Sequence, residues 1–85
     1  MIESGLIVEL SNNKKYIITD STIENGKVYY LALEVDYKTE DPTEQSMFFE
    51  HGSDDTLIPV KDESDVEFLK TIFVNKFLDD VVEDN

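Results

Sequence analysis

The chain has 85 residues, 40% of them hydrophobic, and it carries 7 basic residues against 20 acidic ones, for a net charge of −13. This length fits one small domain, residues 1–85, and without cysteine the chain has no disulfide, no thiol nucleophile and no cysteine-ligated metal. The negative charge argues against direct binding of nucleic acid or of anionic membranes, because both are polyanionic.

The charge is distributed unevenly along the chain. Residues 1–39 hold six acids and four lysines, a net charge of −2, whereas residues 40–85 hold fourteen acids and three lysines, a net charge of −11. A concentrated negative field attracts cationic surfaces. We therefore expect the partner to be a basic protein surface, of the kind that nucleic-acid-binding enzymes expose. The alternative is that the acids only keep the protein soluble.

The sequence offers no sign of export or of a membrane anchor. Its first five residues contain no basic segment, and the longest apolar run, residues 28–33, is too short for a signal peptide or a membrane span. We therefore expect a cytoplasmic protein.

The first predicted elements form a hairpin. Residues 6–10 alternate as a strand does, residues 11–14 contain an Asn pair that suits a tight turn, and residues 15–19 return as a second strand. On this return strand, Tyr16 and Ile18 share one face and Ile17 takes the other. Residues 20–26 then predict a turn, with Asn25 and Gly26 as its strongest signal.

The longest predicted strand covers residues 27–35, and one of its faces is wholly apolar. This apolar face consists of Tyr29, Leu31, Leu33 and Val35.

A polar stretch with Pro42, residues 36–45, predicts a surface loop. Residues 46–50 are predicted to form a short fourth strand, residues 51–55 a turn, and residues 56–60 a fifth strand. Because Pro59 cannot donate a hydrogen bond to a neighbouring strand, we expect the fifth strand to lie at a sheet edge or to end there.

One helix is predicted over residues 64–78. Ser64 and Glu67 fit a capping box, in which each side chain bonds to the other's backbone amide. Apolar residues then recur at helical spacing, and acids near the carboxyl end oppose the helix dipole, so residues 80–85 are expected to be a frayed acidic tail. The fold class is therefore α+β: an antiparallel meander of four or five strands with one C-terminal helix packed on one face. The predicted core-facing stripe of the helix is Val66, Leu69, Ile72, Phe73 and Phe77.

Three segments resemble those of a known family: residues 26–31 (GKVYYL), residues 57–60 (LIPV) and residues 65–69 (DVEFL). In this order the chain resembles the YrzB-like family of short acidic bacterial proteins, over residues 6–84. The resemblance implies a small sheet, one helix and an acidic end. It transfers no activity and no site residue, so it supports the fold more than any function.

Two sets of residues are candidates for binding. The acidic set would dock the basic partner, and in one form of this hypothesis it imitates a DNA phosphate backbone, as in a phage or mobile-element inhibitor that occludes a nucleic-acid-binding site. Apolar residues off the helix stripe, Phe68, Val74 and Leu78, support an alternative, a small structural or regulatory subunit that forms a homodimer. The acidic candidates are Asp36, Glu40, Asp41, Glu44, Glu50, Asp54, Asp55, Asp62, Glu63 and Asp65.

Aromatic pairs add a further candidate. Neighbouring strand residues face opposite sides of a sheet, so one ring of each pair is expected in the core, and the other could be an exposed binding hot spot. The pairs are Tyr29 with Tyr30, and Phe48 with Phe49.

Catalysis and metal binding have weak signals. His51 is the only imidazole, and a hydrolase that pairs it with Ser53 lacks the glycines of a nucleophile elbow. Two acidic groups could hold a divalent ion, but neither matches a calcium loop, and the three glycines form no phosphate-binding loop. We therefore expect no enzyme, no metal and no cofactor. The two groups are His51 with Asp54 and Asp55, and Asp79 with Asp80, Glu83 and Asp84.

Overall fold

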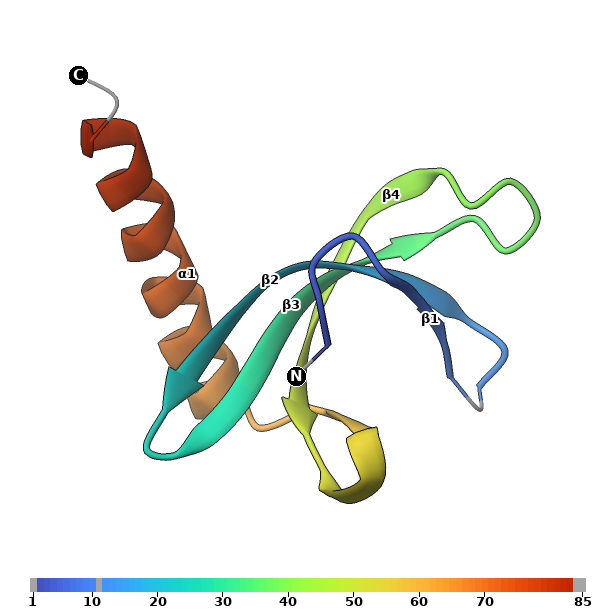
Figure 1. The fold of residues 1–85 in the computed structure, drawn as a ribbon, viewed down its shortest axis with the longest axis horizontal. Coiled ribbons are helices and arrows are strands. Elements are labelled where there is room, and N and C mark those ends of the chain that lie inside the picture. Colours follow the sequence, from blue (N-terminus) through green and yellow to red (C-terminus); the bar gives the residue numbers. More distant parts are fainter. Residues whose placement is uncertain (1, 11, 84–85) are drawn as a thin grey trace.

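Five antiparallel strands form one curled meander sheet, with a single helix after them (Figure 1). The computed structural model describes residues 2–10 and 12–83, with side chains described through residue 78. The predicted α+β class is confirmed, and the strands lie in the order β1-β2-β3-β4-β5. The elements are β1 (Ile7–Glu9), β2 (Lys15–Glu24), β3 (Lys27–Val35), β4 (Pro42–His51), the 3₁₀ turn η1 (Ser53–Asp55), β5 (Leu57–Pro59) and α1 (Glu63–Glu83).

The turn between β2 and β3 is tighter than predicted. Only Asn25 and Gly26 form it, with φ angles of 54° and 78°, as a two-residue hairpin turn requires. The prediction of a turn over residues 20–26 is wrong, because β2 continues to Glu24 and Ile23 pairs with Val28. The β-branched residues of this segment extend the ladder rather than the loop.

A β-bulge at Thr19 reverses the faces of β2. Ile18 lies opposite Ala32 and Asp20 lies opposite Leu31, so Thr19 is an extra residue, and its hydroxyl donates to the Leu31 carbonyl at 3.0 Å. A bulge bends its strand and shifts the alternation of side chains by one. Asp20 therefore joins the face that carries α1, and the sheet curls.

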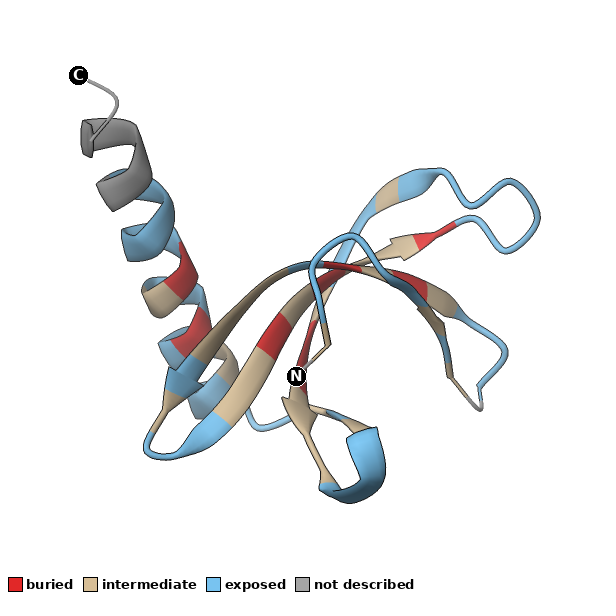
Figure 2. Ribbon diagram, viewed as in Figure 1, coloured by how far each residue is buried: buried red, intermediate tan, exposed pale blue. Residues whose placement is uncertain are grey.

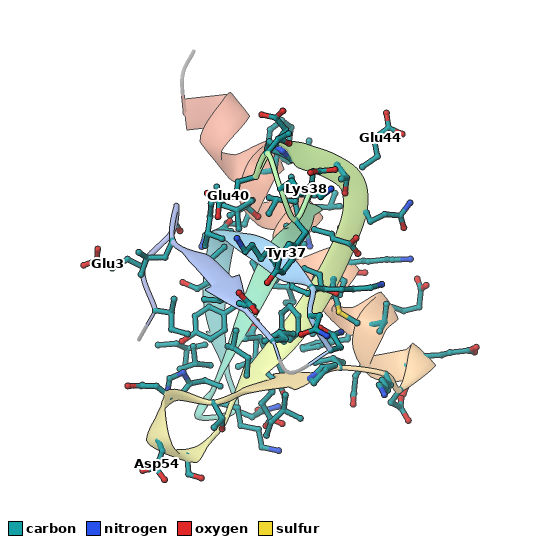
Figure 3. The ribbon with its side chains drawn as sticks, turned by 90° about the vertical axis from the view of Figure 1, so that its right-hand side faces the viewer. Glu3, Tyr37, Lys38, Glu40, Glu44 and Asp54 are labelled. Atoms are coloured by element: carbon teal, nitrogen blue, oxygen red, sulfur yellow. The ribbon has the colours of Figure 1, made fainter. Side chains whose placement is uncertain are left out.

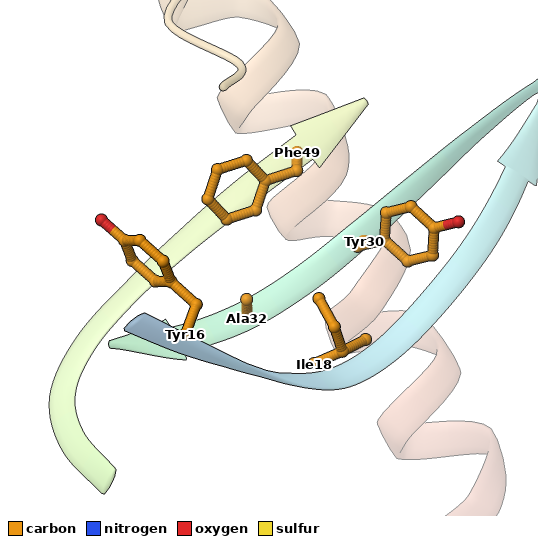
Figure 4. Close-up of a cluster of buried hydrophobic side chains, with 5 residues drawn as sticks. All are labelled: Tyr16, Ile18, Tyr30, Ala32 and Phe49. Atoms are coloured by element: carbon orange, nitrogen blue, oxygen red, sulfur yellow. The ribbon is translucent and has the colours of Figure 1, made fainter. Parts of the chain in front are cut away.

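The concave face of the sheet holds the main core. Its buried residues come from β2, β3 and β4, and we call them the inner cluster (Figure 4). Within it, the rings of Tyr16 and Phe49 meet edge to face, with centroids 5.2 Å apart, a favoured aromatic geometry. The curled sheet itself encloses this cluster without any contribution from the helix. The inner cluster consists of Tyr16, Ile18, Tyr30, Ala32 and Phe49.

The other face of the sheet packs against α1 through a smaller group. Phe48, Leu69 and Phe73 are buried there, and we call them the helix cluster; the rings of Phe48 and Phe73 stack with centroids 5.7 Å apart. Phe48 and Phe49 are thus both buried, on opposite faces, so the expectation that one ring of this pair is exposed is wrong. Both faces of the sheet are covered, which the sequence pattern did not indicate.

The strands that flank the predicted loop differ from expectation in length. β4 begins at Pro42, so the loop between β3 and β4 is shorter than the predicted residues 36–45. A proline can stand at the first residue of a strand, where its missing donor costs little. β5 is the outer strand of the sheet and ends at Pro59, as predicted.

The helix starts and ends outside its predicted limits. The carboxylate of Asp62 accepts from the amides of Ser64 at 3.0 Å and Asp65 at 3.2 Å, so Asp62 is the N-cap and the Ser64 to Glu67 capping box is wrong. α1 continues to Glu83, five residues beyond the predicted end and through most of the predicted tail. Residues 84–85, at the end of the predicted tail, lie outside the described residues.

The C-terminal end of α1 projects past the sheet (Figure 1). Among residues 63–78 of the helix, whose burial is described and shown in Figure 2, the buried positions are Leu69 and Phe73. The last described contact with the sheet is Lys76, whose ammonium donates to the Asp20 carboxylate at 2.8 Å and to the Ser21 carbonyl at 2.7 Å. Phe77 follows on the same stripe but is 66% exposed, so its predicted core position is wrong: the stripe continues after the sheet has ended.

Candidate functional site

The predicted acidic residues divide into groups at opposite ends of β4. Figure 3 shows Glu40 and Glu44 toward one end of the molecule and Asp54 at the other. The seven residues of β4 that follow Glu44, residues 45–51, span roughly 23 Å. Four residues, which we call the loop acids, are Asp36, Glu40, Asp41 and Glu44. Five residues that flank β5, which we call the turn acids, are Asp54, Asp55, Asp62, Glu63 and Asp65. Glu50, the tenth, is half-buried and pairs with Lys27 at 3.4 Å.

The loop acids take part in the structure of their own turn. Asp36 accepts from the amides of Lys38 at 2.9 Å and Thr39 at 3.0 Å, and these bonds hold the pKa of its carboxyl below the usual range. Glu40 pairs with Lys15 at 3.0 Å, which raises the pKa of Lys15, and the Lys15 ammonium lies 4.6 Å from the centre of the Tyr37 ring. Of the four loop acids, Glu40 therefore pairs with a lysine and Asp36 bonds to backbone amides of its own turn.

The turn between β4 and β5 holds two acids in a strained backbone. Asp54 and Asp55 have φ angles of 57° and 59°, in the left-handed region that most residues avoid. Such positions cost of order 1 kcal/mol or more and recur at functional sites. The turn is closed by Gly52, where an added Cβ would lie 2.4 Å from the Thr56 hydroxyl. This tight turn presents both carboxylates as exposed side chains.

The other turn acids lie at the start of α1. Besides its two amide bonds, Asp62 accepts from the Ser64 hydroxyl at 2.5 Å, and this hydrogen bond is the main reason that the pKa of Asp62 lies below its ordinary value. Glu63 and Asp65 occupy the first helical turn, where the helix dipole favours negative charge. Asp62 is thereby held ionised, and all three carboxylates are exposed.

Five of the seven lysines are already paired with acids in the chain. Within residues 2–10 and 12–78, no lysine ammonium lies within 4 Å of a turn acid carboxylate. The only cationic partner there is the imidazole of His51, 3.3 Å from Asp55, and it carries charge only when protonated. Among the described residues, the turn acids are therefore not neutralised by any lysine. The lysine pairs are Lys14 with Glu34, Lys15 with Glu40, Lys27 with Glu50, Lys70 with Glu67 and Lys76 with Asp20.

His51 belongs to a hydrogen-bond chain that leads into the inner cluster. The Tyr30 hydroxyl accepts from the Ile2 amide at 3.0 Å and lies 2.7 Å from His51 Nδ1, so its proton is free to point at that nitrogen. His51 Nε2 then faces Asp55. Both ring nitrogens are engaged, and neither contacts Ser53 in the part of the chain that the structure describes.

The residues proposed for self-association do not share one face of α1. Phe68, Val74 and Leu78 are 49%, 55% and 51% exposed. Val74 and Leu78 are one turn apart, and Phe77 lies beside them, whereas Phe68 is about 120° around the helix from Val74. The sequence analysis had assigned Phe77 to the core, so it missed that Phe77 forms an exposed apolar surface together with the predicted Val74 and Leu78.

No metal site is formed among the described residues, where no group of three or more His, Asp or Glu side chains could hold an ion. His51 contacts Asp55, but Asp54 does not join them. The side chains of the second predicted group lie outside the described residues: Asp79, Asp80, Glu83 and Asp84.

A cavity between the two outer strands is a feature that the sequence did not indicate. It has a volume of about 720 Å³ and is lined from one side by β1 and from the other by β5. Its existence depends on how far the sheet curls, which no local pattern specifies.

Comparison of the chain with protein families, with curated proteins and with solved structures gives no match. The resemblance to the YrzB-like family therefore stays a prediction. In the described part of the chain, no helix combines the length and the apolar character that crossing a bilayer requires.

Proposed function

We propose that the protein is a non-catalytic binding module that docks a basic protein surface through the turn acids. The observation that carries this proposal is the absence of a lysine partner for these five carboxylates in the described structure, while most lysines are paired elsewhere. An excess of fixed, exposed negative charge speeds encounter with a cationic surface and disfavours anionic partners.

The spacing of the acids argues against a long DNA mimic. A mimic of duplex DNA needs charges that repeat along a line, since duplex DNA carries one charge per roughly 1.7 Å of its axis. Residues 45–51 of β4 separate the loop acids from the turn acids, and the one acid among them is Glu50, whose charge Lys27 offsets. We therefore assign docking to the turn acids and not to a continuous ridge.

Affinity capture tests this function. The immobilised chain is exposed to lysate from its own source at 0.05, 0.15 and 0.5 M NaCl, and bound proteins are identified by mass spectrometry. We expect a basic partner whose recovery falls at least tenfold over this range, because salt screens exposed charges. The double variant Asp54→Lys/Asp55→Lys should lose this partner. Capture that does not change with salt contradicts the proposal.

A matched control separates local docking from overall charge. The double variant Asp41→Lys/Glu44→Lys changes the net charge by the same amount at the opposite end of β4, and it should retain most of the capture. Equal loss from both double variants would mean that the partner responds only to net charge, which contradicts docking at the turn acids.

A glycine variant separates docking from folding. Asp54→Gly/Asp55→Gly relieves the left-handed strain at both positions and should stabilise the protein by about 1 kcal/mol in urea unfolding. The same variant removes two docking carboxylates and should weaken capture. Weaker capture by a more stable protein cannot come from misfolding, whereas unchanged capture would exclude these two residues.

Self-association through α1 is a second candidate, favoured by the exposed apolar surface at Val74, Phe77 and Leu78. Sedimentation velocity at micromolar concentration would show a dimer that Phe77→Glu dissociates. The exposed Phe68→Glu, on another face of the helix, is the matched control. A monomer at 100 μM excludes this candidate.

A further inference from the structure

The two outer strands of the sheet face the same cavity without pairing with each other. β1 pairs only with β2, and β5 pairs only with β4, so the curled sheet stops short of a closed barrel. The cavity of about 720 Å³ between them is in the size range of ligand sites in proteins. Its wall combines apolar and polar side chains, and it carries two carboxylates and one ammonium group. The apolar part includes Val8, Leu10, Leu57 and Pro59, and the charged residues are Glu9, Asp55 and Lys61.

β1 offers a complete set of free backbone groups at its open edge. The Leu6 carbonyl accepts from β2 and the Leu10 amide donates to the segment entering β2, both at 2.9 Å, so these alternate residues face β2. Neighbouring residues of an antiparallel strand point their backbone groups to opposite sides. The N–H and C=O groups of Ile7 and Glu9 therefore point away from β2, toward the open edge.

β5 offers a less complete edge. The Thr56 carbonyl accepts from the Gly52 amide, just after β4, at 2.8 Å, and the Val60 amide donates to the Phe48 carbonyl of β4 at 2.9 Å. The backbone groups of Leu57 and Pro59 therefore point away from β4. Proline has no N–H, which leaves this edge with one donor. An unpaired strand edge is a template for another chain, and the edge of β1, with two donors and two acceptors, is the stronger template.

We propose that an extended segment of the basic partner pairs with the open edge of β1 and adds a sixth strand to the curled sheet. This inference rests on the proposed function and specifies the kind of segment that the partner supplies. Strand addition draws its affinity from main-chain hydrogen bonds and its specificity from alternate side chains. The edge of β1 supplies the main-chain groups, and its alternating side chains supply the specificity.

The faces of β1 define the sequence of the added strand. Val8 faces the cavity, so the residue opposite it points into the cavity and is apolar. Glu9 lies on the outer face, where the Tyr37 hydroxyl donates to its carboxylate at 3.2 Å. We expect the residue of the added strand that lies opposite Glu9 to be lysine or arginine. Lys15 neighbours Glu9 in the ladder but bonds to Glu40 instead. The partner segment therefore alternates basic and apolar residues.

Charge argues against a second copy of this chain as the occupant. Each copy carries a net charge of −13, and the edge of β1 itself carries Glu9 rather than a cation. Pairing of two β1 edges would bring two such carboxylates together, and like charges across a strand pair are destabilising. A cationic strand from another protein meets no such repulsion.

The test uses the full chain and a blocked octapeptide of alternating lysine and valine at 0.15 M NaCl. Amide hydrogen exchange by NMR should slow at least tenfold for the Ile7 and Glu9 N–H groups when the peptide saturates the protein. A peptide of the same composition in two blocks, four lysines followed by four valines, should give no such protection. Ile7→Pro removes an edge donor without removing a bond to β2 and should weaken binding about fivefold, whereas Ile7→Thr should bind like the wild type.

Three outcomes overturn this inference. Binding of both peptides without protection of Ile7 and Glu9 would mean charge attraction alone, which leaves the proposed function standing. Protection of these amides that grows with protein concentration in the absence of peptide would make a second copy the occupant. Absence of binding by either peptide removes strand addition, and salt-independent lysate capture is the separate result that removes the proposed function.

Discussion

The two faces of the sheet are closed in different ways. On the concave face, three long strands curl around the inner cluster, and aromatic rings from different strands meet there. On the other face, α1 covers a cluster of only three buried residues and then continues past the sheet. The concave face is thus the stronger part of the core, although it also contains the open seam between β1 and β5. The curl of the sheet both buries the inner cluster, which stabilises the fold, and leaves the proposed binding edge of β1 open.

The strongest test of this difference is Phe49→Ala. Phe49 is fully buried in the inner cluster and contacts Tyr16, so its loss should lower the free energy of unfolding by about 3–5 kcal/mol. For a domain of this size that is a large fraction of the total stability. Urea unfolding followed by circular dichroism measures it. A loss below about 1 kcal/mol would mean that the inner cluster does not carry the fold.

The helix-covered face should respond less. Leu69→Ala removes the most buried side chain of α1 and should cost about 2–3 kcal/mol, toward the lower end of such losses, because the helix can shift against an open surface. Phe77→Ala, on the same stripe but past the sheet, is the control and should change the free energy of unfolding by less than about 0.5 kcal/mol. If Leu69→Ala costs more than Phe49→Ala, the ranking of the two faces is reversed.

Tyr30→Phe tests the polar chain within the concave face. The substitution keeps the ring in the inner cluster but leaves the Ile2 amide and His51 Nδ1 without their partner, which should cost about 1–2 kcal/mol. The His51 ring nitrogen shifts in NMR should change, while those of the helix amides should not. Unchanged stability together with unchanged His51 shifts would contradict the hydrogen-bond chain.

The smallest expected effect concerns the cap of α1. The pKa of Asp62 is lowered in the folded protein, mainly by the Ser64 hydroxyl, so its stabilising contribution is present above its unfolded pKa of about 3.9 and is lost as the pH falls through the folded value. Asp62→Asn keeps a cap without this titration. The wild type should exceed it in Tm by a few degrees at pH 6, and the gap should close below pH 4. A gap that stays constant with pH would contradict the assigned cap.

The sequence was sufficient for the class of fold but not for its curvature. Alternation and turn residues predict β1, β3 and the Asn25 to Gly26 turn because these signals are local. The bulge at Thr19 and the burial of both Phe48 and Phe49 depend on how distant strands meet. The helix cap was misplaced because Asp62 and Ser64 are both good N-cap residues, and only the path of the chain after β5 selects Asp62.

Less of the candidate site could be predicted. Composition identifies an excess of acids, but it does not show which carboxylates a lysine reaches in space, as Lys15 reaches Glu40 across 25 positions. The open edge of β1 and the cavity beside it follow from sheet curl alone. Phe77 is exposed because the sheet ends before it, and the periodicity of a helix sequence gives no information on where a sheet ends.

The most direct measurement for the proposed function is the rate at which the captured partner associates with the two matched charge variants. In stopped-flow experiments at 0.05 M NaCl, Asp54→Lys/Asp55→Lys should associate at least tenfold more slowly than the wild type, and Asp41→Lys/Glu44→Lys should stay within about threefold of it. Both differences should shrink at 0.5 M NaCl. Equal association rates for the two variants would contradict docking at the turn acids.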